Sequence, residues 1–159
     1  MGVMLPKSAQ NVQDTLTKSG LEFKVIELSE STRTANEAAE TIGCTVGQIV
    51  KSLMFQKQES KAPILVLASG VNRVNEKTIG NLLGEKVEKA DADFTRKITG
   101  FAIGGIPPVG HKHPIETFID EDLLGYKELW AAAGTPNAVF QLEPKALVTL
   151  TQGKVISIK

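Results

Sequence analysis

The chain has 159 residues, of which 42% are hydrophobic and 23% charged, as is typical of one soluble globular domain with one core. Its 18 lysines and arginines balance its 18 aspartates and glutamates, so no global field would draw it to a nucleic acid or a membrane. The single cysteine excludes an internal disulfide, and the lack of an apolar leader or a membrane-length apolar run indicates a cytoplasmic protein.

Hydrophobic periodicity and turn residues divide the first half of the chain into short helices and strands. A helix capped by Ser8 should end near Gly20, and a capping box that begins at Thr34 should open a helix that ends at Gly43. Two of the strands are separated only by a polar turn and should form a hairpin. The expected strands cover residues 21–28, 49–57 and 63–69.

The second half of the chain continues this alternation of helix caps and β-prone runs. Asn75 and Asp91 should each cap a helix, and the glycines at positions 84 and 100 should end them. Pro144 suits the first turn of a last helix. The expected strands cover residues 85–89, 116–119, 128–133, 138–142 and 154–158.

Short strands mixed with short helices indicate an α+β fold. We expect one domain, residues 1–159, around a single mixed β-sheet that could curl into a barrel and is flanked by helices. No internal repeat or low-complexity segment divides the chain, and only 5% of its residues are aromatic. That aromatic content argues against a platform on which single-stranded bases stack.

The stretch from residue 99 to residue 120 holds four of the 14 glycines, three of the seven prolines and both histidines. Glycine lets a ligand approach the main chain, and proline fixes the backbone, so residues 104–108 (GGIPP) predict a rigid loop with accessible backbone groups. Because the flanking residues 101–103 and 117–119 are apolar or β-prone, we expect the loop to connect two strands. An ordinary strand connection rich in glycine and proline is the alternative interpretation.

Lys51 is the most informative single residue, because it lies inside the run 49–55 (IVKSLMF), whose two faces are both largely apolar. Such a strand should be central and buried, and a lysine there is costly unless its ammonium finds a partner. A phosphate or carbonyl oxygen of a ligand would be a fitting partner. The alternative is a lysine that reaches water from the end of the strand.

Other reactive side chains give weaker signals. His111 and His113 could offer a metal two ligands, but no further ligand motif accompanies them, so we expect no metal; exposed loop histidines, or contacts to RNA phosphate, are the alternatives. Cys44 fits a small buried hydrophobe better than a nucleophile. Several cations form either a local basic patch or dispersed solvated charges. They are Arg73, Arg96, Lys97 and Lys112.

Four segments in this order resemble the YbaK/ProX family of free-standing aminoacyl-tRNA deacylases, which are related to the editing insertion of bacterial prolyl-tRNA synthetases. They are residues 49–53 (IVKSL), 99–101 (TGF), 104–110 (GGIPPVG) and 119–120 (ID). The similarity runs over about residues 5–158, and the lysine and the loop together make it specific.

This resemblance implies a barrel-like mixed sheet and the removal of a wrong small amino acid from the 3′ end of a tRNA, often tRNA-Pro, without a metal or other cofactor. It implies that Lys51 is the residue most needed for activity. It also implies that the Gly/Pro loop lines the aminoacyl pocket. The residues expected to contact the substrate are Gly104, Gly105, Ile106, Pro107, Pro108, Thr34 and Gly134.

The sequence departs from the branch of the family that clears cysteine. Thr34 stands where that branch has a phenylalanine, Val139 where it has an aspartate, and Ala132 where it has a serine. Gly134 matches a late glycine of the family. The departures leave the amino acid open among alanine, serine, threonine, cysteine or another small side chain.

For ester hydrolysis, backbone N–H groups at Gly105 and Ile106 are candidate donors to the developing oxyanion, and Lys51 could supply a fixed positive charge. No side chain stands out as a general base, so a water or a ribose hydroxyl of the tRNA should take that part. The expected partners are a mischarged tRNA and an aminoacyl-tRNA synthetase. The alternative class is a non-catalytic module that binds an aminoacyl or nucleotide ligand or regulates.

Overall fold

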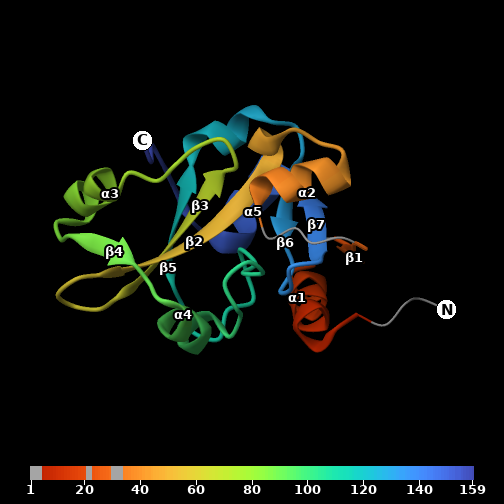
Figure 1. Cartoon of the computed structure of the whole chain (residues 1–159), viewed down its shortest axis with the longest axis horizontal. Helices are drawn as coiled ribbons and strands as arrows, with labels where there is room; N and C mark the ends of the chain where they lie inside the picture. The colour runs from red at the N-terminus through yellow and green to blue at the C-terminus, as the bar shows by residue number, and fades with distance from the viewer. Residues whose placement is uncertain (1–4, 21–22, 30–33) are drawn as a thin grey trace.

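The computed structural model describes residues 5–20, 23–29 and 34–159, which form one domain with five α-helices around an eight-stranded sheet (Figure 1). The predicted α+β class with a mixed sheet is confirmed. The helices are α1 (Lys7–Lys18), α2 (Ala35–Ile42), α3 (Glu76–Leu83), α4 (Ala92–Thr99) and α5 (Pro144–Thr151), with 3-10 turns η1 (Val46–Gln48) and η2 (Glu121–Gly125). The strands are β1 (Val25–Glu27), β2 (Ile49–Lys57), β3 (Pro63–Ser69), β4 (Val87–Lys89), β5 (Glu116–Asp120), β6 (Leu129–Ala132), β7 (Ala138–Leu142) and β8 (Lys154–Ile156).

The sheet runs in the order β1-β7-β6-β2-β3-β5-β8, and β4 pairs with β2 beside this path. Three contacts are parallel, namely β2 with β6, β3 with β5 and β5 with β8, and the others are antiparallel. The predicted hairpin is β2–β3, which pairs Val50 with Ser69 through to Gln56 with Pro63. As expected, β2 lies in the middle of the sheet.

One edge of β2 is divided between two partners. β6 pairs only with Ile49 and Val50, and β4 pairs only with residues from Phe55 onward. Residues 51–54 therefore have no strand partner on this edge among the described residues, apart from the Met54 carbonyl, which accepts from the Ala90 N–H at 3.1 Å. A strand edge left open inside a sheet exposes backbone donors and acceptors.

Side-chain caps place the helices around this sheet as the sequence predicts. The Thr34 hydroxyl accepts from the Glu37 N–H at the start of α2, and α3 and α4 begin with the same kind of bond to Asn75 and Asp91. Ser8 does not cap α1: the N-cap is Pro6, whose fixed φ suits a helix start, and Ser8 lies within the first turn.

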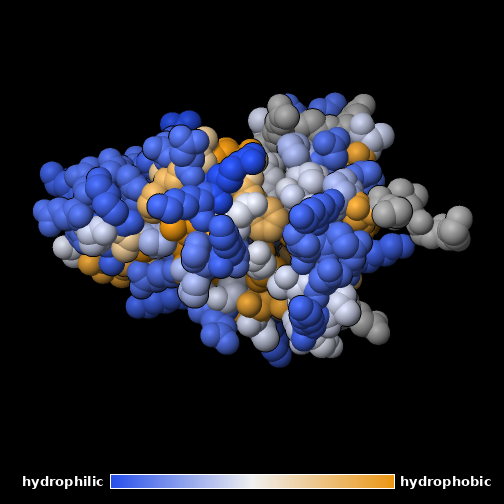
Figure 2. Space-filling view, turned by 90° about the horizontal axis from the view of Figure 1, so that it is seen from below, coloured by the Kyte–Doolittle hydropathy of each residue, from blue (hydrophilic) through white to orange (hydrophobic). Residues whose placement is uncertain are grey.

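Buried apolar residues form clusters on both faces of the sheet. The largest joins α1, α5 and the loop after α4 to the strands, with Leu16, Phe140 and Leu147 fully buried within it. A second cluster packs Ile79 of α3 against β3, and a third packs Ala38 of α2 against the start of β2. The face seen from below is largely hydrophilic, with hydrophobic side chains gathered near its middle (Figure 2).

Some boundaries differ from the sequence-based expectation. Residues 101–103 form a turn after α4, so the Gly/Pro loop connects a helix to β5 and not two strands; Phe101 is buried in the core, which explains its apolar character. The first strand is shorter than residues 21–28, of which 21 and 22 lie outside the described residues. β8 ends at Ile156, and η2 was not predicted.

Candidate active site

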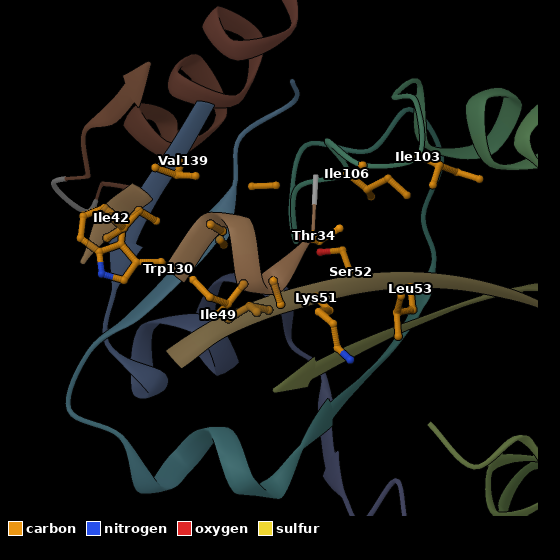
Figure 3. A pocket seen from close by; sticks show the side chains of 16 residues that line it. Thr34, Ile42, Ile49, Lys51, Ser52, Leu53, Ile103, Ile106, Trp130 and Val139 are labelled. Atoms are coloured by element: carbon orange, nitrogen blue, oxygen red, sulfur yellow. The ribbon is translucent and has the colours of Figure 1, made fainter. Parts of the chain in front are cut away.

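A cavity of about 310 Å³ lies where the open edge of β2 meets α2, β6, β7 and the Gly/Pro loop (Figure 3). Its wall is mostly small or aliphatic. Its polar side chains are Thr34, Lys51 and Ser52, with the indole of Trp130 at one side, and no described lining residue is an aspartate, glutamate or histidine. The apolar lining residues are Ala35, Ala38, Ile42, Ile49, Val50, Leu53, Ile103, Ile106, Ala131, Ala132 and Val139.

Lys51 is half-buried, and its ammonium donates a hydrogen bond to the backbone carbonyl of Asn72. The Asn72 side-chain amide donates in turn to the carboxylates of Asp120 at 2.8 Å and Asp122 at 2.7 Å. Asp120 is fully buried and also accepts from the Ser69 N–H at 3.0 Å. An ammonium has three donors, so this network holds Lys51 with one and leaves two for a ligand.

Burial is the main cause that lowers the pKa of Lys51 below its ordinary value of 10.5. The positive charge of Arg73 lowers the pKa further, and the carboxylate of Asp120 opposes both. A bound anion would relieve the repulsion between the two cations. The electrostatics of the strand centre therefore favour an anionic or electron-rich oxygen beside Lys51.

Ser52 leaves β2 on the face opposite to Lys51, and its hydroxyl points into the space below Ile106 (Figure 3). This hydroxyl is buried and has no hydrogen-bond partner. Odd-numbered residues of β2 bond towards β3, as the bond from the Gly70 N–H to the Ile49 carbonyl at 2.8 Å shows, so the backbone of Ser52 faces the open edge. Buried polar groups without partners are rare in folded proteins and often mark a ligand site.

The Gly/Pro loop is rigid because several bonds hold it from behind. Gly105 lies so close to Thr135 that an added Cβ would stand 2.9 Å from three backbone atoms of that residue. The Gly105 carbonyl accepts from the Gly134 N–H at 2.8 Å, and Gly134 has a φ of +97°, which a residue with a side chain rarely adopts. The His111 Nε2 donates to the Pro107 carbonyl at 2.7 Å, because a carbonyl can only accept.

The loop's free backbone groups differ from those predicted. The Gly105 N–H, expected as an oxyanion donor, donates to the Ala102 carbonyl at 3.2 Å. The Ile106 N–H and the carbonyls of Ile103 and Gly104 make no hydrogen bond with any described residue. Of the two predicted donors, only Ile106 is therefore available.

The structure brings Lys51, Thr34, Gly104 and Ile106 to the wall of one cavity, although they come from three separate parts of the sequence. The other predicted contact residues do not line it. Gly105, Pro107 and Pro108 are buried residues of the loop itself, and Gly134 supports the loop from the turn between β6 and β7. They shape the cavity without facing it.

Sequence reasoning missed three polar residues of the site. Ser52 was assigned only to a strand face, and Asn72 and Asp120 were not singled out as partners of Lys51. The available signal was that Ser52, next to Lys51, is the other polar side chain in the otherwise apolar run of residues 49–55. Nothing in the sequence places Asn72 beside Lys51, because that contact depends on the path of the chain after β3.

The remaining predicted candidates lie elsewhere. His113 is exposed, whereas His111 is half-buried and holds the loop, and the described residues contain no group of three or more possible metal ligands close together. Cys44 packs beside α2, and burial raises the pKa of its thiol, which disfavours a nucleophilic thiolate. No helix in the described part of the chain is long and apolar enough to span a membrane.

A family model described as the aminoacyl-tRNA editing domain matches residues 29–150. YwhH of Bacillus subtilis is 32% identical over 148 residues, which cover 93% of this chain and 94% of that protein. A protein of Enterococcus faecalis named "Putative Cys-tRNA(Pro)/Cys-tRNA(Cys) deacylase EbsC" is 28% identical over 131 residues, which cover 82% of this chain and 79% of that protein.

A similar solved structure is described as a "putative trans-editing enzyme for prolyl tRNA synthetase". It has a TM-score of 0.93 and 48% sequence identity, and the match covers 98% of this chain and 99% of that one. The mixed sheet and its helices are therefore the same fold as in that structure.

Proposed function

Because the chain belongs to the aminoacyl-tRNA editing domain family, we propose that the whole chain acts as one editing domain that hydrolyses the ester of a mischarged tRNA. The family supports a deacylase role, and the amino acid and the tRNA are the finer parts of the proposal. The observation that carries it is the cavity at the open edge of β2, where an apolar wall meets Lys51, an unpartnered Ser52 hydroxyl and a free loop N–H.

The apolar part of the cavity takes the side chain of the amino acid. About 310 Å³ is small for a ligand site, and it must also admit the ester and part of the ribose, so only small side chains fit. Val139 and Ala132 offer no polar group to a cysteine or serine side chain. A pocket of this kind excludes by size and separates substrates that differ by one methyl only about 10- to 200-fold.

The polar groups take the reacting part of the substrate. The Ser52 hydroxyl and the carbonyls of Ile103 and Gly104 can accept from the substrate ammonium, and the Ile106 N–H can donate to the carbonyl oxygen. Preorganised donors at a developing oxyanion are often the largest contribution to ester hydrolysis. Lys51 supplies a fixed positive charge through its two remaining donors.

Hydrolysis then needs only a positioned water. The water attacks the carbonyl carbon, the bond to the ribose oxygen breaks, and that oxygen leaves with a proton, giving the free amino acid and an uncharged tRNA. The described cavity wall has no carboxylate or imidazole to accept the proton, so a neighbouring ribose hydroxyl or a second water carries it. Catalysis rests mainly on positioning and on fixed charge.

Similarity to a Cys-tRNA(Pro) deacylase and to a trans-editing structure for prolyl-tRNA synthetase makes tRNA-Pro the first substrate to test, with the synthetase as a partner. The panel should compare alanyl, seryl, threonyl, cysteinyl and phenylalanyl esters of the same tRNA. We expect cleavage of several small esters and not of the phenylalanyl ester. Efficient cleavage of phenylalanyl-tRNA, or binding of all five without turnover, would contradict the proposal, the latter in favour of a non-catalytic module.

A further inference from the structure

A second cavity of about 520 Å³ adjoins the first across the open edge of β2. The two cavities share residues 51–53 of the strand and Ile103 and Ile106 of the loop, so a ligand can extend from one into the other. The wall of the second is different, because it is completed by Arg73, Lys89 and Thr95 where the first has alanines and valines. An apolar pocket and a polar pocket thus meet at Lys51.

The second cavity is rich in unpaired positive charge. Lys51, Arg73 and Lys89 line it, against one carboxylate, Glu76. Among the described residues, neither Arg73 nor Lys89 forms an ion pair or donates a side-chain hydrogen bond. The repulsion between Lys51 and Arg73 that lowers the lysine pKa points the same way. Arg73 and Lys89 are exposed, so both are accessible to a ligand, and such cations form strong charge-assisted hydrogen bonds with a phosphate or a carboxylate.

Thr95 gives an independent indication of a ligand at this place. The residue is fully buried in α4, borders the cavity, and its hydroxyl has no hydrogen-bond partner. Helical threonines usually bond the carbonyl four residues earlier, and Thr99, one turn further on, does so to the Thr95 carbonyl at 2.7 Å. The Thr95 hydroxyl does not make this bond, so it can donate to an acceptor such as a phosphate oxygen.

We propose that the second cavity binds the phosphodiester that joins the terminal adenosine of the RNA to the nucleotide before it, with Arg73 and Lys89 as the phosphate-binding side chains. The proposal rests on the proposed function, since it takes the ester to lie in the first cavity. The strand edge then carries the terminal ribose, the acyl group extends to the apolar side, and the chain of the RNA leaves past Lys51. A neutral protein would thereby obtain a local contact to RNA phosphate.

The test compares two inert probes that differ by this phosphodiester, adenosine and the dinucleotide cytidylyl-(3′→5′)-adenosine, bound to the native protein and followed by NMR titration. Neither probe carries an aminoacyl ester, so the result is independent of turnover. We expect the dinucleotide to bind at least about tenfold more tightly than adenosine, a contribution of about 1.4 kcal/mol. Its affinity should fall with rising salt, and the Arg73→Ala/Lys89→Ala variant should bind both probes alike.

The matched control is Lys145→Ala/Lys154→Ala, which also removes two positive charges, from exposed residues outside the cavity. It should retain the preference for the dinucleotide. Thr95→Val should weaken binding of the dinucleotide. It should leave the temperature of the thermal transition unchanged or raise it, because it removes an unpaired buried hydroxyl.

Three results would overturn the proposal: equal affinity of the native protein for the two probes, an unchanged preference in the Arg73→Ala/Lys89→Ala variant, or inorganic phosphate that binds as tightly as the dinucleotide. The last would indicate a general anion site. The native protein could cleave no aminoacyl ester and still prefer the dinucleotide, with this preference lost in the Arg73→Ala/Lys89→Ala variant. In that case the proposed function fails and the phosphodiester site stands.

Discussion

Replacing Ser52 by alanine should make the protein more stable and less active. The Ser52 hydroxyl is buried without a partner at the wall of the cavity. Leaving such a group unsatisfied costs about 1–3 kcal/mol, and its removal creates no new void because it already borders a cavity. Alanine is somewhat less suited to a strand, by less than about 1 kcal/mol, so the net gain should be about 1 kcal/mol.

For a chain of this size that gain corresponds to a rise of about 2–4 °C in the thermal transition, which calorimetry or circular dichroism can measure. If the hydroxyl accepts from the substrate ammonium, its loss removes a bond to a charged group worth about 1.5–3 kcal/mol. In rate terms kcat/KM should fall roughly 10- to 150-fold in a deacylation assay.

Ser157→Ala is the matched control, because Ser157 is exposed and lines neither cavity. It should change neither the transition temperature nor kcat/KM appreciably. A Ser52→Ala protein that melts at a lower temperature and keeps full activity would refute the reasoning, since the hydroxyl would then be paired in solution and unused by the substrate.

Three further outcomes follow from the loop and from Lys51. Gly105→Val should lower activity on every ester together and destabilise the protein by about 1–3 kcal/mol, as denaturant unfolding would measure, because a side chain would press on the Thr135 backbone; full activity would contradict this. Burial lowers the pKa of His111 against the opposing Pro107 bond, so the unfolded chain takes up a proton more readily. The free energy of unfolding should therefore decline as the pH falls below about 6.5, and this decline should be smaller in His111→Gln. The same pH dependence of the unfolding free energy in both proteins would contradict this role of the histidine. Arg73 lowers the pKa of Lys51, so Arg73→Ala should move the alkaline decline of kcat/KM to higher pH, once spontaneous hydrolysis is subtracted. A decline at the same pH in both proteins would contradict the coupling between Arg73 and Lys51.

Much of the fold could be predicted because its local signals agree. The spans of β2, β3 and β7 and the caps of α2, α3 and α4 come directly from alternation and cap chemistry in the sequence. Residues 101–103 were misread because a short apolar run looks like a strand, although only Phe101 of the three is buried in the core and Ile103 is exposed at the cavity wall. Ser8 was misread because Pro6 already supplies the start of α1.

The site could be predicted only in part, for a physical reason. Lys51 is visible because a charge inside an apolar strand is costly, whichever strands surround it. The open edge of β2 is not visible, because it depends on β6 and β4 pairing with different ends of that edge. Asn72 and the second cavity depend on the same long-range arrangement, so their roles follow only from the structure.

The most direct test of the account is single-turnover hydrolysis of small aminoacyl esters of tRNA-Pro by the native protein and by Lys51→Ala. The variant loses a half-buried charge held by the Asn72 carbonyl, so its circular dichroism should match that of the native protein. We predict that the native protein cleaves alanyl-, seryl- or threonyl-tRNA and that the variant retains less than about a tenth of that rate, a loss of more than 1.4 kcal/mol. A folded variant that retains more than this, or a native protein that cleaves none of these esters, would contradict the central claim.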